Sequence, residues 1–242
     1  MASRDDNMNN KIGIFDSGIG GLTTLEEIKK LLPNEDYIYY ADSKNNPYGE
    51  KSDSDLLAIV KNIVEFLLNK KVKIIVIACN TATTRCIETL RHDYPQINFI
   101  GTEPAIKVAC DKSFKNTLVL ATPGTISSEK VHKLVKDNIH DDQKIHLLAC
   151  DGLANAIETK DDEKINTILQ NLLNDYKNEN IDSIVLGCTH YPIIKDKIQS
   201  FFPNAKLIDG NVGVAKRVKF ILEENNLLSK DNTGNVEFIQ SK

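Results

Sequence analysis

The sequence predicts an α/β protein of two pseudo-symmetric domains, each with a parallel sheet, and an active site at their interface. Short runs rich in Ile and Val alternate with amphipathic helical patterns along the 242-residue chain. The predicted strands begin near residues 11, 36, 72 and 97 and again near 116, 144, 183 and 205, so the two series are offset by 105, 108, 111 and 108 residues. This nearly constant offset indicates a repeated unit. One doubly wound sheet of eight strands is the alternative.

The individual elements follow from the same patterns. Strands are expected at residues 11–15, 36–40, 72–78, 97–101, 116–121, 144–149, 183–187 and 205–208. Helical spacing of apolar residues predicts helices over 56–67, 131–135, 165–176 and 214–222, with a helix-compatible run at 85–91. We expect a first domain of residues 11–100 with 209–242, a second of 101–208, and a disordered leader at 1–10. No Gly/Ser/Pro-rich linker separates the domains, which favours tight packing.

Each half contains an apolar strand that ends in a cysteine. Residues 74–78 lead into Cys79, and residues 183–187 lead into Cys188. Open parallel sheets bind ligands at the carboxyl ends of their strands. Two like domains would therefore place Cys79 and Cys188 opposite each other, and helix N-termini after them would lower the thiol pKa values. The remaining cysteines are predicted to be small core residues: Cys86, Cys110 and Cys150.

Composition excludes several classes of protein. The net charge of −4 and the pI near 5.8 give no indication of the basic surface that nucleic-acid-binding proteins have. No apolar run is long enough to span a bilayer, and residues 1–10 lack the apolar core of a signal peptide. Five cysteines without a CxxC pair indicate reduced thiols and argue against a zinc ribbon. We therefore expect a cytoplasmic protein that binds neither nucleic acid nor membrane.

Two turns have the residues of anion-binding sites. The glycine-rich segment 15–23 follows the first strand, and its backbone N–H groups could approach an anion at a helix N-terminus. It lacks the full GxGxxG pattern and a Walker lysine, so a plain tight turn is the alternative. The equivalent segment 122–125 of the second half also combines hydroxyls with glycine. Two such turns would suit a substrate with two carboxylates, whereas the turn at 46–51 on its own indicates a surface loop.

Two facing cysteines are compatible with three kinds of chemistry. They could form a disulfide, or one could be a nucleophile with a histidine base. They could also be acid–base groups on opposite faces of one carbon. Removing a proton from one face and returning it to the other inverts a stereocentre. A pseudo-symmetric enclosure fits this task best, because a planar carbanion presents two nearly equivalent faces.

An ordered set of motifs resembles the glutamate racemase family. The segments are 15–21 (FDSGIGG), 47–52 (PYGEKS), 78–82 (ACNTA), 103–105 (EPA) and 187–192 (GCTHYP). The resemblance covers the chain from about residue 11 to the last predicted helix. It implies an enzyme that needs neither a cofactor nor a metal and that interconverts L- and D-glutamate, supplying D-glutamate for peptidoglycan synthesis. It also implies a homodimer.

The resemblance assigns roles to particular residues. Cys79 would serve D-glutamate and Cys188 would serve L-glutamate, with Asp16, His190 and Glu158 as their polar partners. The implied substrate contacts are Asp16, Ser17, Tyr48, Gly49, Asn80, Thr81, Thr122, Thr125, Thr189 and His190. Segment 150–155 departs from the usual Pro-containing pattern of the family.

Two other functions compete with this interpretation. One is a related racemase that acts on aspartate or a hydantoin. The motifs at 16–18 and 48–49 argue against this function. The other is a non-catalytic protein that closes two lobes around an anionic metabolite. Binding alone needs no thiols, so the cysteines at matched strand ends argue against it.

Reagents can test the expected chemistry. Since the activity is expected to depend on thiols alone, racemisation should survive EDTA and hydroxylamine but be abolished by a thiol alkylator. Glutamate should slow the alkylation by occupying the site. The measurement is the change in circular dichroism of L-glutamate with time, and loss of activity in EDTA would contradict the expectation.

Overall fold

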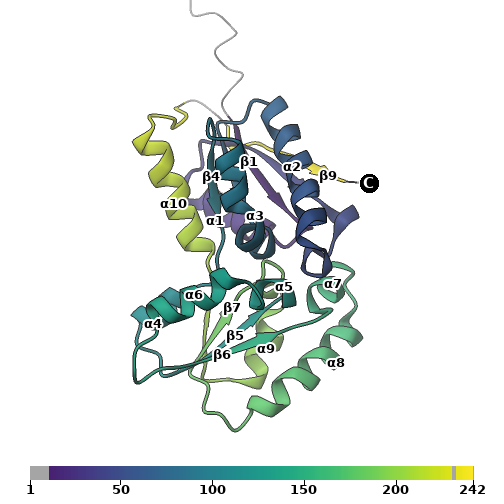
Figure 1. The fold of residues 1–242 in the computed structure, drawn as a ribbon, viewed down its shortest axis with the longest axis vertical. Coiled ribbons are helices and arrows are strands. Elements are labelled where there is room, and N and C mark those ends of the chain that lie inside the picture. The colour runs from purple at the N-terminus through teal and green to yellow at the C-terminus, as the bar shows by residue number, and fades with distance from the viewer. Residues whose placement is uncertain (1–10, 231–232, 242) are drawn as a thin grey trace, which may run out of the picture.

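The computed structural model describes residues 11–230 and 233–241, so the predicted leader lies outside the described residues. These residues form two α/β lobes, each built on an all-parallel sheet (Figure 1). The first sheet has the strand order β4-β3-β1-β2-β9 and the second β6-β5-β7-β8. The predicted fold class is confirmed, and the alternative of a single eight-stranded sheet is wrong.

The two sheets repeat one topology. The strands are β1 Lys11–Asp16, β2 Asp36–Ala41, β3 Ile74–Ile77, β4 Asn98–Gly101, β5 Asn116–Ala121, β6 Lys144–Ala149, β7 Ser183–Leu186, β8 Lys206–Ile208 and β9 Val236–Gln240. Apart from β9, the order β4-β3-β1-β2 of the first sheet corresponds to β8-β7-β5-β6 in the second. The constant sequence offset therefore reflects a topological repeat.

Helices cover the sheets of both lobes (Figure 1). The α-helices are α1 Leu22–Leu31, α2 Asp53–Asn69, α3 Asn80–Asp93, α4 Ile106–Asp111, α5 Pro123–Ile126, α6 Glu129–Asn138, α7 Leu153–Glu158, α8 Asp162–Leu173, α9 Lys195–Phe201 and α10 Asn211–Glu224. Short 3₁₀ turns are η1 Ser43–Asn45, η2 Tyr48–Glu50, η3 Asn174–Tyr176 and η4 Tyr191–Ile194. Within the described ranges, none of the helices has the length and apolarity to cross a membrane.

The central strands position the two cysteines. All residues of β3 and of β7 are buried, as expected for strands covered on both faces. Helix α2 begins where the Ser52 side chain accepts a hydrogen bond from Asp55 N, and its apolar face joins the core of the first lobe. The strands end at the side of each sheet that faces the other lobe, so Cys79 and Cys188 follow them into the interface.

The C-terminal chain returns to the first lobe. Helix α10 packs on α1, and its buried Val214, Val218 and Leu222 belong to the same apolar cluster as Leu25 and Ile28. This agrees with the helix predicted over 214–222.

Strand β9 was not predicted from the sequence. It pairs in parallel with β2 at the edge of the first sheet, and the ring of Phe238 stacks on Tyr39 with centroids 5.7 Å apart. Because β9 is short and half exposed, its sequence lacks the continuous apolar run that marks the central strands.

A buried ion pair anchors the chain between α10 and β9. Lys73 and Glu35 pair with side chains that are each 2% exposed. The Lys73 Nζ also donates to Leu227 O at 2.7 Å and to Ser229 Oγ at 3.0 Å. Burial lowers the pKa of Lys73, opposed by the Glu35 carboxylate. Loss of either partner would leave a buried charge without compensation.

We predict that Glu35→Gln lowers the free energy of unfolding by about 3 kcal/mol, because it leaves the buried Lys73 uncompensated. Glu237→Gln is the matched control. Glu237 pairs with Lys11 and Lys70 where all three side chains are well exposed, so the loss should stay below about 1 kcal/mol. Urea denaturation measures both, and equal losses would refute the prediction.

Candidate active site

Both cysteines line one pocket between the lobes. Cys79 follows β3 and caps α3, whereas Cys188 follows β7, and the thiol residues are 5% and 7% exposed. The pocket is lined by Ser17, Asn46, Pro47, Tyr48, Gly49, Cys79, Asn80, Thr81, Thr122, Ala154, Cys188, Thr189 and His190. The free volume inside this pocket is only about 10 Å³, so its lining residues lie close to one another in this structure.

Asp16 ends β1 and is fully buried behind the pocket. Its Oδ2 accepts hydrogen bonds from Gly18 N at 3.3 Å and Gly21 N at 3.0 Å, and Thr189 Oγ1 donates to Oδ1 at 3.2 Å. Burial raises the pKa of Asp16, although the charge of His190 opposes this shift. The bond from Thr189 crosses between the lobes and ties Asp16 to the Cys188 side of the site.

The glycine-rich turn binds carboxylates of the protein itself. Gly18 and Gly21 donate their N–H groups to Asp16, and Ile19 N donates to Glu158 Oε2 at 3.0 Å. The expectation that these N–H groups approach an anionic ligand is therefore wrong for these three residues, because side chains already occupy them.

Close packing explains the glycines of this turn. A Cβ on Gly18 would lie 2.3–2.5 Å from the carboxyl group of Glu158. A Cβ on Gly20 would lie 2.6 Å from Thr189 Oγ1 and 2.7 Å from His190 Nδ1. Side chains of the second lobe thus contact the backbone of the first lobe directly, which is possible only without a side chain at these positions.

His190 connects Cys188 to Glu158. Its Nδ1 lies 3.8 Å from Cys188 Sγ and its Nε2 lies 2.8 Å from Glu158 Oε2. Burial alone would lower the pKa of His190, but Cys188 and Glu158 outweigh it and raise this pKa to about 10. The pKa of Glu158 is lowered, because hydrogen bonds from His190, Ile19 N and Ser43 outweigh its burial. The imidazolium of His190 therefore lies directly beside the sulfur of Cys188.

Cys79 has the opposite electrostatic surroundings. Burial, and then the charge of Asp16, raise its pKa well above the ordinary value. The backbone N–H groups of Ala82 and Thr81 at the start of α3 act against this shift but do not overcome it. The expected lowering by a helix N-terminus is therefore wrong for Cys79. After Cys188 the chain forms the 3₁₀ turn η4 before α9, so the expected helix does not begin there.

Hydroxyl groups connect the two lobes on the Cys79 side. Thr81 Oγ1 lies 2.9 Å from Thr122 Oγ1 and 3.1 Å from Thr125 Oγ1, and Thr122 donates to Thr125 at 3.0 Å. Thr125 belongs to this cluster but is not among the residues that line the pocket. Asn80 is buried at the start of α3 and donates to Thr102 O at 3.3 Å.

Sequence reasoning missed several residues of the site. Asn46 lines the pocket, and its Oδ1 is the one buried side-chain oxygen or nitrogen in the described ranges without a hydrogen-bond partner. Asp42 accepts from the Tyr48 hydroxyl at 2.7 Å, while Arg85 donates to Lys51 O at 2.8 Å. Both therefore support the loop over the pocket. The Arg85 bond joins residues 34 positions apart and has no local signal in the sequence, whereas Asp42 lies only 6 positions from Tyr48.

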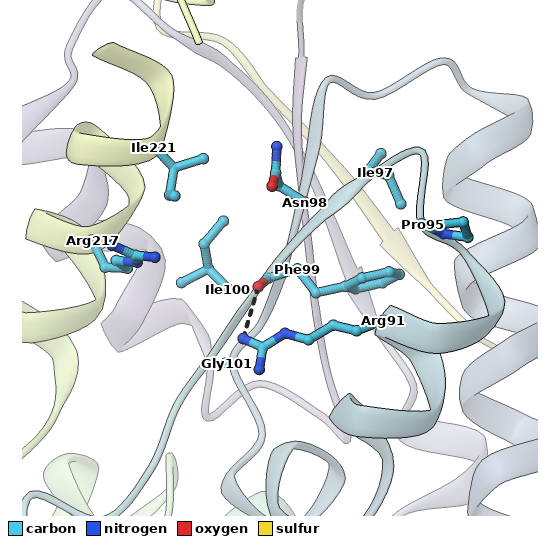
Figure 2. Close-up of a pocket in the computed structure, with 9 residues that line it drawn as sticks. All are labelled: Arg91, Pro95, Ile97, Asn98, Phe99, Ile100, Gly101, Arg217 and Ile221. Atoms are coloured by element: carbon cyan, nitrogen blue, oxygen red, sulfur yellow. Dashed lines mark hydrogen bonds between the residues drawn. The ribbon is translucent and has the colours of Figure 1, made fainter. Parts of the chain in front are cut away.

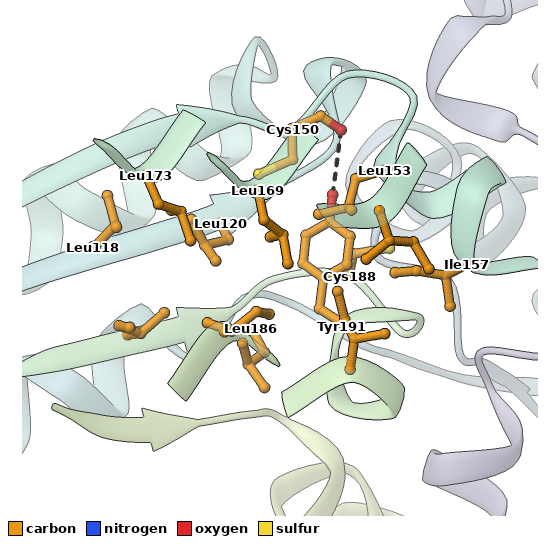
Figure 3. Close-up of a cluster of buried hydrophobic side chains, with 14 of the residues drawn as sticks. Leu118, Leu120, Cys150, Leu153, Ile157, Leu169, Leu173, Leu186, Cys188 and Tyr191 are labelled. Atoms are coloured by element: carbon orange, nitrogen blue, oxygen red, sulfur yellow. Dashed lines mark hydrogen bonds between the residues drawn. The ribbon is translucent and has the colours of Figure 1, made fainter. Parts of the chain in front are cut away.

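The core beneath Cys188 is apolar. Figure 3 shows Tyr191 extending from its turn toward Cys150, where its hydroxyl donates to Cys150 O at 3.5 Å. Burial raises the pKa of Cys150 to about 12. Cys86 and Cys110 are likewise buried in apolar clusters, so the prediction that these three cysteines belong to the core is confirmed.

A second pocket lies at the edge of the first sheet. Arg91 and Arg217 approach it from α3 and α10, and Arg91 donates to Phe99 O at 3.3 Å (Figure 2). Its lining contains no cysteine, histidine or carboxylate, so it lacks an acid–base pair. In the part of the chain that the structure describes, no group of three or more His, Cys, Asp or Glu side chains is arranged to hold a metal ion.

Comparison with known proteins identifies the family. The sequence pattern described as Asp/Glu/Hydantoin racemase matches residues 19–218. The chain belongs to this racemase family. The matched range includes Cys79 and Cys188 of the racemase pocket, whereas Asp16, Ser17 and β9 lie outside it.

Relatives of this racemase resemble it over nearly their whole length. It is 42% identical to a glutamate racemase of Clostridium perfringens, with 98% of this chain and 93% of the relative covered. It is 44% identical to glutamate racemase 2 of Bacillus subtilis, with 96% and 88% covered. The crystal structure of a Francisella tularensis glutamate racemase in complex with D-glutamate is 30% identical and superposes with a TM-score of 0.83, covering 97% of this chain and 89% of that one.

The raised pKa of His190 predicts a specific titration. NMR of the imidazole should show His190 protonated at pH 8 with a midpoint near pH 10, and Glu158→Gln should lower the midpoint by removing the carboxylate. His146, whose pKa is lowered chiefly by burial, is the internal reference and should not change. A His190 midpoint near the ordinary value of about 6.5 would contradict the ion pair.

The same shift has a consequence for stability. Folding raises the pKa of His190, so protonation of this residue contributes to the free energy of unfolding. This contribution should be fully present below about pH 6.5 and lost as the pH rises through about 10.

Proposed function

We propose that the protein interconverts L- and D-glutamate without a cofactor, using Cys79 and Cys188 as the acid–base pair. The observation that carries the proposal is the electrostatic contrast between two thiols in one pocket. Cys188 lies beside the imidazole of His190, whereas burial and Asp16 keep Cys79 protonated. A two-base racemase needs this combination, since one group must accept a proton while the other donates one.

The proton transfers follow from these surroundings. With L-glutamate, the Cys188 thiolate takes the Cα proton, and the Cys79 thiol gives its proton to the opposite face. D-glutamate reacts in the reverse direction from the complementary protonation state. Each turnover therefore exchanges the protonation states of the two sulfurs. The His190 imidazolium stabilises the thiolate on the Cys188 side, and Glu158 holds the imidazolium through Nε2.

The polar lining supplies the groups for substrate binding. We assign the contacts to Ser17, Tyr48, Gly49, Asn80, Thr81, Thr122, Thr189 and His190, which line the pocket. Asp16 and Thr125 lie behind this lining and act through Thr189 and Thr81, respectively. Hydrogen-bond donors fixed before reaction stabilise the charge that develops on the carbanion.

The alternatives make different predictions for substrates. Both curated relatives described above are glutamate racemases and are more than 40% identical to this chain. Aspartate is one methylene shorter, so its Cα would move off the line between the sulfurs. A misplacement of about 1 Å can reduce a rate about a hundredfold. Comparable turnover of aspartate would favour the related racemase, and absence of turnover with any amino acid would favour a binding protein.

We further propose a cytoplasmic homodimer that supplies D-glutamate for peptidoglycan synthesis, as the resemblance to glutamate racemases implies. All five cysteines are free and buried, which suits a reducing compartment. Light scattering tests the dimer.

Isotope incorporation tests the two-base mechanism. In D₂O, product formed early should carry deuterium at Cα while the remaining substrate stays protiated, because the incoming hydrogen comes from the second, exchanged thiol. NMR or mass spectrometry of both enantiomers measures this. An enzyme with one base would return the original proton or label both pools, and either result would overturn the mechanism.

Substitution of the thiols gives an independent test of the same mechanism. Cys79→Ser and Cys188→Ser should each stop racemisation in both directions, because a serine hydroxyl is a far weaker acid than a thiol. Cys110→Ala is the matched control, since Cys110 is buried in an apolar cluster outside the pocket. Its rate should remain near that of the wild type. Near wild-type activity of either serine variant would rule out the paired thiols.

A further inference from the structure

Glu158 is held by groups of both lobes. It ends α7 in the second lobe, and its Oε2 interacts with His190 Nε2 at 2.8 Å and Ile19 N at 3.0 Å. Its Oε1 accepts from Ser43 Oγ at 3.0 Å, and within the described ranges Ser43 is the group that donates to this oxygen. The side chain is 12% exposed, so these bonds rather than water determine its orientation.

Ser43 is in turn oriented by the C-terminal strand. A serine hydroxyl has one proton, and Ser43 uses it on the Glu158 carboxylate, so Oγ can only accept elsewhere. Gln240 Nε2, at the end of β9, donates to Ser43 Oγ at 3.0 Å. The next residue fixes the loop as well, since Ser241 N donates to Ala41 O and Lys44 N donates to Ser241 Oγ, both at 3.0 Å.

We propose that Ser43 is a positioning residue of the active site, whose hydroxyl, oriented by Gln240, holds Glu158 against His190 and thereby sets the geometry of the Cys188 base. This inference rests on the proposed racemase function. It follows from a continuous series of hydrogen bonds from β9 through Ser43, Glu158 and His190 to Cys188. Bonds to a carboxylate are stronger than bonds between neutral groups, so Ser43 is well suited to this task.

The effect should fall on one of the two proton transfers. Ser43 is not among the residues that line the pocket, and its bonds lead to the Cys188 side. Loss of its hydroxyl leaves Oε1 of Glu158 without this donor, so the carboxylate can turn away from His190. The transfer at Cys188 then slows, while the substrate contacts and the transfer at Cys79 keep their geometry.

Kinetics of Ser43→Ala test the proposal. We expect kcat/KM to fall about tenfold, equivalent to about 1.4 kcal/mol, chiefly through kcat. The loss should be equal for both enantiomers, because their equilibrium constant is one. Ser43→Thr should restore the rate, since it keeps the hydroxyl.

The isotope effect of Cα deuterium distinguishes positioning from general damage. With L-glutamate the slowed step breaks the Cα bond, so the isotope effect should increase in Ser43→Ala. With D-glutamate the slowed step follows bond breaking, so the effect should fall toward unity. Equal changes for both enantiomers would overturn the proposal, since they would indicate a general disturbance of the site.

Two substitutions in β9 complete the test. Gln240→Glu replaces the donor by an acceptor that competes for the Ser43 proton, so it should reduce kcat in the same way as Ser43→Ala. Glu237→Gln lies on the same strand and only removes the ion pairs with Lys11 and Lys70, so it should leave kcat unchanged.

The outcomes separate the two proposals. If the wild type racemises glutamate and Ser43→Ala keeps a kcat within twofold of the wild-type value, only the role of Ser43 is overturned. A wild type that does not racemise glutamate would overturn the proposed function together with it.

Discussion

The interface between the lobes depends on two carboxylates, one buried and one largely buried, that each bind groups from the opposite half of the chain. Asp16 of the first lobe accepts from Thr189, and Glu158 of the second lobe accepts from Ile19 N and Ser43. Buried carboxylates are stable only when such partners are present. The same bonds therefore hold the lobes together and determine where His190 and Cys188 lie. The glycines of the turn allow this approach, because a Cβ at Gly18 would overlap Glu158.

Within this frame the pseudo-symmetric fold is electrostatically asymmetric. Cys79 and Cys188 follow equivalent strands, yet one is next to a buried carboxylate and the other next to an imidazolium. Symmetry of the backbone places the two sulfurs in one pocket. Different neighbours then surround the two sulfurs, so the two sides of the pocket are not electrostatically equivalent.

Much of the fold and part of the site could be predicted from local patterns. The strands before Cys79 and Cys188 are continuous apolar runs, so burial of central strands is visible in the sequence. Strand β9 could not be predicted, since its pairing with β2 joins distant segments and its side chains are half exposed. The ligand role expected for the N–H groups of the glycine turn was wrong in part for the same reason, because Ile19 N donates to Glu158, which is 139 residues away. Gly18 and Gly21 instead donate to Asp16, which directly precedes the turn.

The sequence alone determined the two-sheet α/β fold, the repeat and the positions of both cysteines at strand ends, because burial and periodicity are local properties of the chain. Tertiary structure decided which groups surround each sulfur. It raised the pKa of Cys79 by burial where a helix N-terminus was expected to lower it, and it joined Ser43 to Glu158 across the lobes. Protonation and hydrogen bonding depend on neighbours that are close in space but distant in sequence, so only the folded chain establishes them.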